Sequence, residues 1–196
     1  MTVATVKIIL ASRSPRRREL LSKLGYQFEV VAPEINEERN AGEGPAEHVL
    51  RLSLEKARAI GAHYPNDLVI GADTIVVTDN AILGKPASEA DAISMLKQLS
   101  GKPHVVYTAL TLMIQKENIA RSDYDSTRVV FNELGQDAIL EYVKSGEPLD
   151  KAGAYGIQGM GSFLVHHYEG EFDTVIGFPT KLFTRLFEEV VSCRNR

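Results

Sequence analysis

Cysteine is almost absent from this chain of 196 residues, which has a single one, Cys193. One thiol cannot form an internal disulfide, and no CxxC pair is present to indicate a zinc site. This cysteine usage fits a protein of the reducing cytosol. We therefore expect neither a disulfide-stabilised secreted protein nor a zinc protein.

Long apolar runs are also missing. No stretch approaches the roughly 20 apolar residues that a membrane-spanning helix needs. A short apolar run over residues 8–11 is followed by Arg13, whereas a secretory signal carries its positive charge before a longer apolar segment. We expect a cytoplasmic protein that does not act at a membrane.

Positive charge is not in excess either. The chain has 22 Lys and Arg residues against 26 Asp and Glu residues, which gives a formal net charge of −4. This balance excludes a protein that coats long nucleic acids by charge alone, but it leaves room for a local basic pocket. The apolar share of 44% is that of a globular protein, and the length suits one domain or two small lobes.

Apolar runs and helix signals alternate along the chain and predict an α/β fold. Strands are predicted at residues 6–11, 28–31, 68–70, 75–78, 104–114, 121–131, 162–166 and 174–176. Helices are predicted at residues 15–24, 45–60, 88–99, 134–144 and from 179 onward. The two central long strands form a predicted β-hairpin, which breaks strict strand–helix alternation. We therefore expect a mixed twisted sheet with helices on its faces.

The segment ASRSPRRREL, residues 11–20, has the features of a phosphate site. A buried strand ends in a turn, and Ser14 then caps a helix whose free amides and partial positive charge favour anions. The hydroxyl of Ser12 adds a donor. The guanidinium groups of Arg16 and Arg17 can each form bidentate hydrogen bonds to phosphate oxygens. The alternative is a capped helix with a solvated basic face, but arginines in a first turn oppose the helix dipole and favour a bound anion.

Asp73 lies in VIGADTIVV, where one predicted strand ends and the next begins. A carboxylate at the end of a buried strand is costly unless it is paired, bound to a metal or facing a cleft. The alternative is an ordinary turn aspartate between two hairpin strands, and the segment alone does not decide between them.

Two further segments could contact a nucleotide. Lys85 stands between Gly84 and Pro86, where a rigid loop lysine suits a phosphate, although an ordinary turn lysine also fits. The predicted loop over residues 146–161 has five glycines, which let a backbone approach a ligand closely. Within it, Tyr155 could stack on a base and Gln158 could hydrogen-bond a base edge. A merely flexible loop is the alternative.

Five motifs in this order resemble the Maf family of nucleotide pyrophosphatases: ASRSPRRREL, EKARA, GADTIV, GKP and DKAGAYGIQG. Each motif is weak alone, but the ordered set is specific and extends over residues 8–190. The resemblance implies a single domain over residues 1–196, with two lobes around a cleft and a fold related to the inosine triphosphate pyrophosphatases. It also implies a homodimer.

The resemblance assigns roles to individual residues. The family's proton acceptor falls on Asp73, and its phosphate and active-site positions fall on Ser12, Arg17, Glu37, Lys56 and Lys85. Three positions associated with substrate choice fall on Arg16, Thr74 and Gln158, which resemble the branch that prefers dTTP and UTP. The branch that prefers 7-methyl-GTP has Trp, Gln and Glu instead, which suit a cationic purine.

The implied reaction is hydrolysis of dTTP and UTP, with modified pyrimidine nucleotides as further candidates, to the monophosphate and diphosphate. The expected cofactor is a divalent cation, Mg²⁺ or Mn²⁺, held by Glu37 and Asp73 together with phosphate oxygens. Asp73 is expected to orient or deprotonate the attacking water, while Arg17, Lys56 and Lys85 hold the phosphates.

Two other classes of function compete with this one. A nucleotide-binding regulator of cell division would bind nucleotide without essential turnover. A serine hydrolase using Ser12 or Ser14 is disfavoured, because the chain has no GxSxG motif and no histidine placed by a motif to activate a serine.

Overall fold

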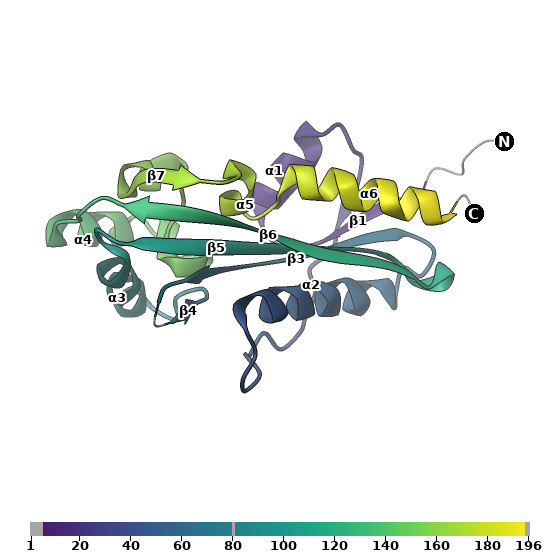
Figure 1. The fold of residues 1–196 in the computed structure, drawn as a ribbon, viewed down its shortest axis with the longest axis horizontal. Coiled ribbons are helices and arrows are strands. Elements are labelled where there is room, and N and C mark those ends of the chain that lie inside the picture. The colour runs from purple at the N-terminus through teal and green to yellow at the C-terminus, as the bar shows by residue number, and fades with distance from the viewer. Residues whose placement is uncertain (1–5, 80, 195–196) are drawn as a thin grey trace. The chain divides into compact units, whose positions relative to one another are not determined.

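The protein is described by a computed structural model that covers residues 6–79 and 81–194. Its strands are β1 (Ile8–Ala11), β2 (Glu29–Val30), β3 (Leu68–Val77), β4 (Ile82–Leu83), β5 (Pro103–Ile114), β6 (Ile119–Phe131) and β7 (Val165–Glu169). Its α-helices are α1 (Pro15–Lys23), α2 (Pro45–Gly61), α3 (Glu89–Leu99), α4 (Gln136–Lys144), α5 (Phe172–Ile176) and α6 (Thr180–Arg194) (Figure 1). Short 3₁₀ helices are η1 (Gln115–Glu117), η2 (Glu147–Asp150), η3 (Ala152–Ala154) and η4 (Gly159–Leu164).

The strands form one mixed sheet in the order β2-β1-β3-β5-β6-β7, and β4 pairs with β3 outside this path. Strand β1 runs parallel to both β2 and β3, whereas the β3–β4 and β6–β7 pairs are antiparallel. The prediction of a mixed sheet with flanking helices is confirmed. None of the helices in the described part of the chain combines the length and apolar character needed to cross a membrane.

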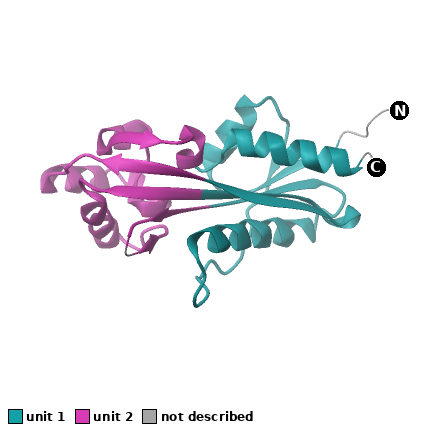
Figure 2. Cartoon of the chain, viewed as in Figure 1, with its two compact units in different colours: residues 1–73, 108–125, 177–196 teal, residues 74–107, 126–176 magenta. Residues whose placement is uncertain are grey.

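The chain divides into two compact units (Figure 2). The first comprises residues 1–73, 108–125 and 177–196, and the second comprises residues 74–107 and 126–176. In the first unit, α2 lies on one side of the strands while α1 and α6 lie on the other (Figure 1). Part of its core is a buried cluster that joins β1, β3 and α2 and includes Ile9, Val69 and Ala57.

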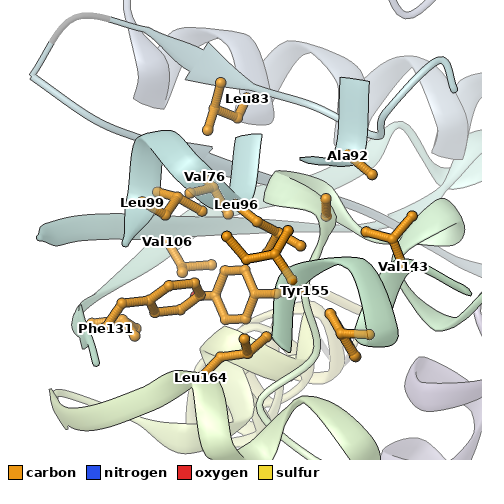
Figure 3. Packing of buried hydrophobic residues seen from close by; sticks show 14 residues of the cluster. Val76, Leu83, Ala92, Leu96, Leu99, Val106, Phe131, Val143, Tyr155 and Leu164 are labelled. Carbon is orange, nitrogen blue, oxygen red and sulfur yellow. The ribbon is translucent and has the colours of Figure 1, made fainter. Parts of the chain in front are cut away.

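The second unit has its own hydrophobic core (Figure 3). Leu96 and Leu99 from α3 and Val143 from α4 pack with Phe131 and Tyr155 in one buried cluster. The aromatic rings of Phe131 and Tyr155 meet edge to face, with centroids 4.7 Å apart. This core supports the segment in which Gln158 lies.

Capping side chains begin the helices where the sequence predicts. The Ser14 hydroxyl accepts from the Arg17 amide at the start of α1, and the Ser88 hydroxyl accepts from the Asp91 amide at the start of α3. At α2, the carboxylate of Glu47 accepts from the amide of Gly44 at 2.9 Å. These bonds satisfy amides that have no acceptor within the helix.

The predicted break in the third strand is wrong. Residues 68–77 form one continuous strand, β3, and Asp73 lies inside it rather than at a turn. A glycine inside a strand sequence looks like a breaker, but Gly71 marks a place where another backbone approaches closely. A Cβ at this position would lie 2.0 Å from the carbonyl oxygen of Ser53 and 2.8 Å from the amide nitrogen of Ala57, both in α2.

Three predictions near the C-terminal third also need correction. The segment predicted as a strand at 174–176 belongs to the short helix α5. The Thr174 amide donates to the carbonyl of Glu171, the residue just before this helix. The predicted loop over 146–161 contains the turns η2 and η3 and the beginning of η4. Residues 162–164 complete η4, so the strand β7 starts only at Val165. These runs are too short for periodicity to separate helix from strand.

Candidate active site

Lys56 joins two carboxylates in the first unit. Its Nζ lies 2.6 Å from Oδ1 of Asp73 and 3.0 Å from Oε1 of Glu37. The side chains of Lys56 and Asp73 are 8% and 7% exposed, whereas that of Glu37 is 49% exposed. Three of the predicted site residues therefore form one cluster, with a buried half and a solvent-facing half.

The packing of α2 on β3 places this cluster. Gly71 and Asp73 are two residues apart on a strand and therefore project to the same face, which is the face that α2 covers. The missing side chain at Gly71 lets the helix backbone approach the strand at Ser53 and Ala57. Lys56 lies between these two residues on α2 and reaches Asp73 from there. Gly71, which resembles a strand breaker in the sequence, thus allows the ion pair between Lys56 and Asp73 to form.

One oxygen of Asp73 is unsatisfied. Its Oδ1 accepts from Lys56, but the buried Oδ2 has no hydrogen-bond partner among the described residues. Buried polar atoms of this kind are rare in folded proteins, and each calls for an explanation such as a catalytic role, a water or an ion. The arrangement can therefore bind a water molecule or a cation at Oδ2 while Lys56 holds Oδ1.

Arg17 connects three segments of the first unit beside this carboxylate. Its Nε donates to the carbonyl of Gly177 at 2.9 Å, and its Nη1 donates to the carbonyl of Ala72 at 2.9 Å and to the Ser12 hydroxyl at 3.3 Å. Burial lowers the pKa of the Arg17 guanidinium, and the negative charge of Asp73 opposes that shift. Arg17 thus fixes the backbone of the residue that precedes Asp73.

The turn before α1 already uses some of the backbone amides that the phosphate-site prediction assigns to a bound anion. The buried Ser12 hydroxyl accepts from the Ser14 amide at 3.1 Å, and the Ser14 hydroxyl accepts from the Arg17 amide at 3.4 Å. These two amides therefore already have acceptors inside the turn. Arg16 lies in the first turn of α1 and is half-buried.

The loop that carries Glu37 is tied to α2 by a buried carboxylate. Both oxygens of Glu43 accept from Arg51, at 2.6 and 2.9 Å, and Oε2 lies 2.9 Å from Nδ1 of His48. Arg51 also donates to the carbonyl of Glu38, the residue after Glu37, at 2.9 Å. Hydrogen bonds from Arg51 hold the pKa of the Glu43 carboxyl well below its usual range.

Lys85, Thr74 and Gln158 belong to the second unit. Lys85 and Gln158 are exposed, and Thr74 is half-buried on β3. The amide of Gly153 donates to the carbonyl of Gly84 at 2.9 Å, so the segments that carry Lys85 and Gln158 are directly linked. The second unit therefore brings these two predicted contacts into neighbouring segments.

Tyr155 does not fit its predicted role. Its side chain is 5% exposed, its hydroxyl lies 2.8 Å from Nε2 of His104, and its ring packs against His104 and Phe131. The prediction that Tyr155 stacks on a base is wrong, because the ring is part of the core. Burial lowers the pKa of His104 to about 4 and raises that of Tyr155, so both groups are neutral near pH 7.

A family model described as Maf-like protein matches residues 7–190 of this chain. The chain belongs to the Maf-like protein family. A relative named dTTP/UTP pyrophosphatase, from Syntrophus aciditrophicus (strain SB), is 47% identical over 175 residues, which cover 89% of this chain and 85% of the relative. Another of that name, from Bacillus mycoides (strain KBAB4), is 47% identical over 173 residues, which cover 88% and 90% of the two chains.

A solved structure titled as a HAM1 protein from Coxiella burnetii has a similar fold. It has a TM-score of 0.51 and 17% identity, and the alignment covers 93% of this Maf-family chain and 99% of the other. At this identity the likeness concerns the fold alone. It agrees with the α/β architecture described above.

The described residues of this Maf-family chain do not form a complete ligand set for the expected metal. No group of three or more His, Cys, Asp or Glu side chains in residues 6–79 and 81–194 is placed to hold a metal ion. Magnesium, however, is commonly bound by one or two carboxylates together with waters and substrate phosphates. The unsatisfied Oδ2 of Asp73 and the half-exposed Glu37 fit that kind of shared site.

Sequence reasoning missed the residues that hold the site in place. Glu43 stands in a polar loop that predicts a solvated surface, yet its side chain is buried by partners on α2. The signal available was the spacing of His48 and Arg51, which are three residues apart and therefore share one helix face. Tyr142 and Glu147 were also missed, because they accept from the backbone amides of Gly156 and Met160, and such contacts leave no pattern in the sequence.

Proposed function

We propose that this Maf-family chain hydrolyses dTTP and UTP to the nucleoside monophosphate and diphosphate. The observation that carries the proposal is the buried Asp73, which is paired with Lys56 through one oxygen and unsatisfied at the other. The names of relatives at 46–47% identity support the substrates. A carboxylate that is held through one oxygen has its other oxygen available to orient a water molecule and accept a proton from it.

Asp73 acts in this proposal as the general base. Its Oδ2 orients a water molecule and takes a proton as the water oxygen attacks the α-phosphorus. The bond between the α-phosphorus and the bridging oxygen breaks, and diphosphate leaves with that oxygen. Lys56 keeps the carboxylate in place through Oδ1 and balances its charge in the buried site.

Positive side chains hold the triphosphate. Its roughly four negative charges need local cations, because the chain as a whole has a net charge of −4. Lys56 and Arg17 supply this charge next to Asp73, and the turn at Ser12 supports Arg17. The assignment of Lys85 to the phosphates rests on the GKP motif, since Lys85 belongs to the second unit.

Glu37 and Asp73 would hold a divalent cation, Mg²⁺ or Mn²⁺, jointly with the substrate. When bound, such an ion neutralises charge on the phosphate oxygens. Glu37 is suited to this because its side chain is half-exposed and its loop is fixed by the contacts of Arg51. Lys56 restrains both carboxylates, which keeps them close together.

Arg16, Thr74 and Gln158 select the base in this proposal. Their side chains carry no carboxylate, which suits an uncharged pyrimidine rather than a cationic methylated purine. Modified pyrimidine nucleotides are further candidate substrates. We also propose that residues 1–196 act as one catalytic domain, that two copies form a homodimer and that the protein works in the cytoplasm.

The test is product analysis with labelled water. The purified full chain is incubated with dTTP and Mg²⁺ or Mn²⁺ in H₂¹⁸O. The products are separated, and the mass of each is measured by mass spectrometry. We expect dTMP with one ¹⁸O atom and unlabelled diphosphate in equal amounts, with ATP and GTP turned over more slowly. Label in the diphosphate, or stepwise release of phosphate, would contradict attack at the α-phosphorus. Binding of dTTP without turnover would favour a regulator.

A further inference from the structure

Two side chains fasten the glycine-rich segment on which Gln158 lies. Tyr142 comes from α4 and is 1% exposed, and Glu147 begins the 3₁₀ helix η2. Both belong to the second unit, as does the whole segment over residues 151–161. The proposed catalytic and specificity residues include neither of them.

The contacts fall on both sides of Gln158. The amide of Gly156 donates to the Tyr142 hydroxyl at 3.0 Å, and the amide of Met160 donates to Oε2 of Glu147 at 3.2 Å. The Tyr142 hydroxyl in turn donates to Oε1 of Glu147 at 3.2 Å. The chain is thus held two residues before and two residues after Gln158 by one connected pair of side chains. We call Tyr142 and Glu147 together the clamp.

Close packing restricts the backbone conformation of this segment. A Cβ at Gly161 would lie 2.2 Å from the carbonyl oxygen of Gly156 and 2.7 Å from the Tyr142 hydroxyl. Gly161 therefore approaches the Gly156 backbone and the Tyr142 hydroxyl more closely than a residue with a side chain could. Gln158 itself is exposed, so its direction depends on how firmly the backbone around it is held.

We propose that Tyr142 and Glu147 are positioning residues for base selection, which aim the amide of Gln158 at the pyrimidine ring. The inference rests on the proposed function, because Gln158 is taken there as a base-reading residue. A side chain held in its binding orientation before the ligand arrives spends less free energy on ordering. The clamp should therefore affect binding of the cognate base more than the handling of phosphates, which all nucleotides share.

The test compares selectivity in four single variants and one double variant of the full chain. Tyr142→Phe removes the hydroxyl that both accepts and donates, and Glu147→Leu removes both acceptor oxygens at similar side-chain size. Gln158→Ala removes the proposed base contact. Ile139→Val is the matched control, because Ile139 is 1% exposed on the same helix but its side chain has no polar atom.

We expect Tyr142→Phe and Glu147→Leu each to lower the ratio of kcat/KM for dTTP to that for GTP by about 3- to 10-fold, the strength of one net hydrogen bond. The loss should appear in the KM for dTTP, with kcat nearly unchanged. Combining Tyr142→Phe with Gln158→Ala should lower the ratio little further than Gln158→Ala alone. Ile139→Val should leave the ratio unchanged, and amide exchange at residues 156 and 160 should be faster only in the clamp variants.

An unchanged ratio in both clamp variants, with a reduced ratio in Gln158→Ala, would overturn the clamp and leave the proposed function standing. Absence of dTTP turnover by the unmodified chain would overturn the proposed function, and the clamp with it. If one clamp variant fails to fold, the other decides, because each breaks a different contact to the segment.

Discussion

The ammonium of Lys56 lies 2.6 Å from a carboxylate oxygen of Asp73, with both side chains more than nine-tenths buried. A buried ion pair of this kind seldom adds net stability, because removing two charges from water costs about as much as their attraction returns. Its presence is better explained by chemistry that needs an anionic carboxylate inside the protein. The unsatisfied second oxygen of Asp73 agrees with that explanation.

Breaking the pair from the lysine side should destabilise the fold. Lys56→Met leaves the buried carboxylate of Asp73 without its cation, which should lower the free energy of unfolding by about 3–5 kcal/mol. The double variant Lys56→Met/Asp73→Asn should recover much of this loss, since it buries no unpaired charge. Urea denaturation at pH 7 measures both. Equal stability of the single and double variants would mean that the two groups are not coupled.

Gly71 should be essential for activity although it contacts no substrate in this account. Gly71→Ala places a Cβ 2.0 Å from the Ser53 carbonyl and forces α2 away from β3. We expect a loss of about 1–3 kcal/mol in unfolding free energy and a fall in kcat of about 100-fold, because Lys56 is displaced from Asp73. Gly135→Ala, whose Cβ meets nothing within 4 Å, is the control. Wild-type kcat in Gly71→Ala would contradict this placement.

Local signals were enough to predict the first strand, the capped start of α1 and the mixed sheet. Each depends on neighbouring residues, such as Ser14 and the amide of Arg17. The continuity of β3 could not be predicted, because the need for Gly71 comes from a helix backbone that is distant in the sequence. The burial of Tyr155 could not be predicted for the same reason, since its hydroxyl meets His104, 51 residues away in the sequence.

Substrate preference should change when the three proposed specificity residues are replaced. Arg16→Trp, Thr74→Gln and Gln158→Glu together supply a stacking ring and a carboxylate, which suit a cationic methylated purine. We expect kcat/KM to fall for dTTP and to rise for 7-methyl-GTP, measured with both substrates on the same preparation. An unchanged order of preference would remove these residues from the account of specificity.

Acid should weaken the second unit through His104. Burial lowers the pKa of His104 from 6.5 to about 4, so between these values the unfolded chain binds a proton that the folded chain does not. Stability conferred by the neutral ring is therefore complete above pH 6.5 and decreases as the pH falls toward 4. We expect this group to account for about 2 kcal/mol of lost stability between pH 7 and pH 5.

The measurement for His104 is urea unfolding at the two pH values. His104→Gln should reduce the difference between them, because the glutamine does not titrate. The exposed His63 gives the control His63→Gln, which should retain the wild-type difference. A wild-type pH dependence in His104→Gln would show that other groups cause it.

The central claim is that the carboxylate of Asp73 accepts the proton of the attacking water. Asp73→Asn keeps the size of the side chain and removes its basicity, so the most direct measurement is diphosphate release from dTTP by this variant beside the unmodified chain. Circular dichroism serves to establish that both are folded. The account predicts that release falls by at least about 100-fold with dTTP binding retained; release at a rate near that of the unmodified chain would contradict it.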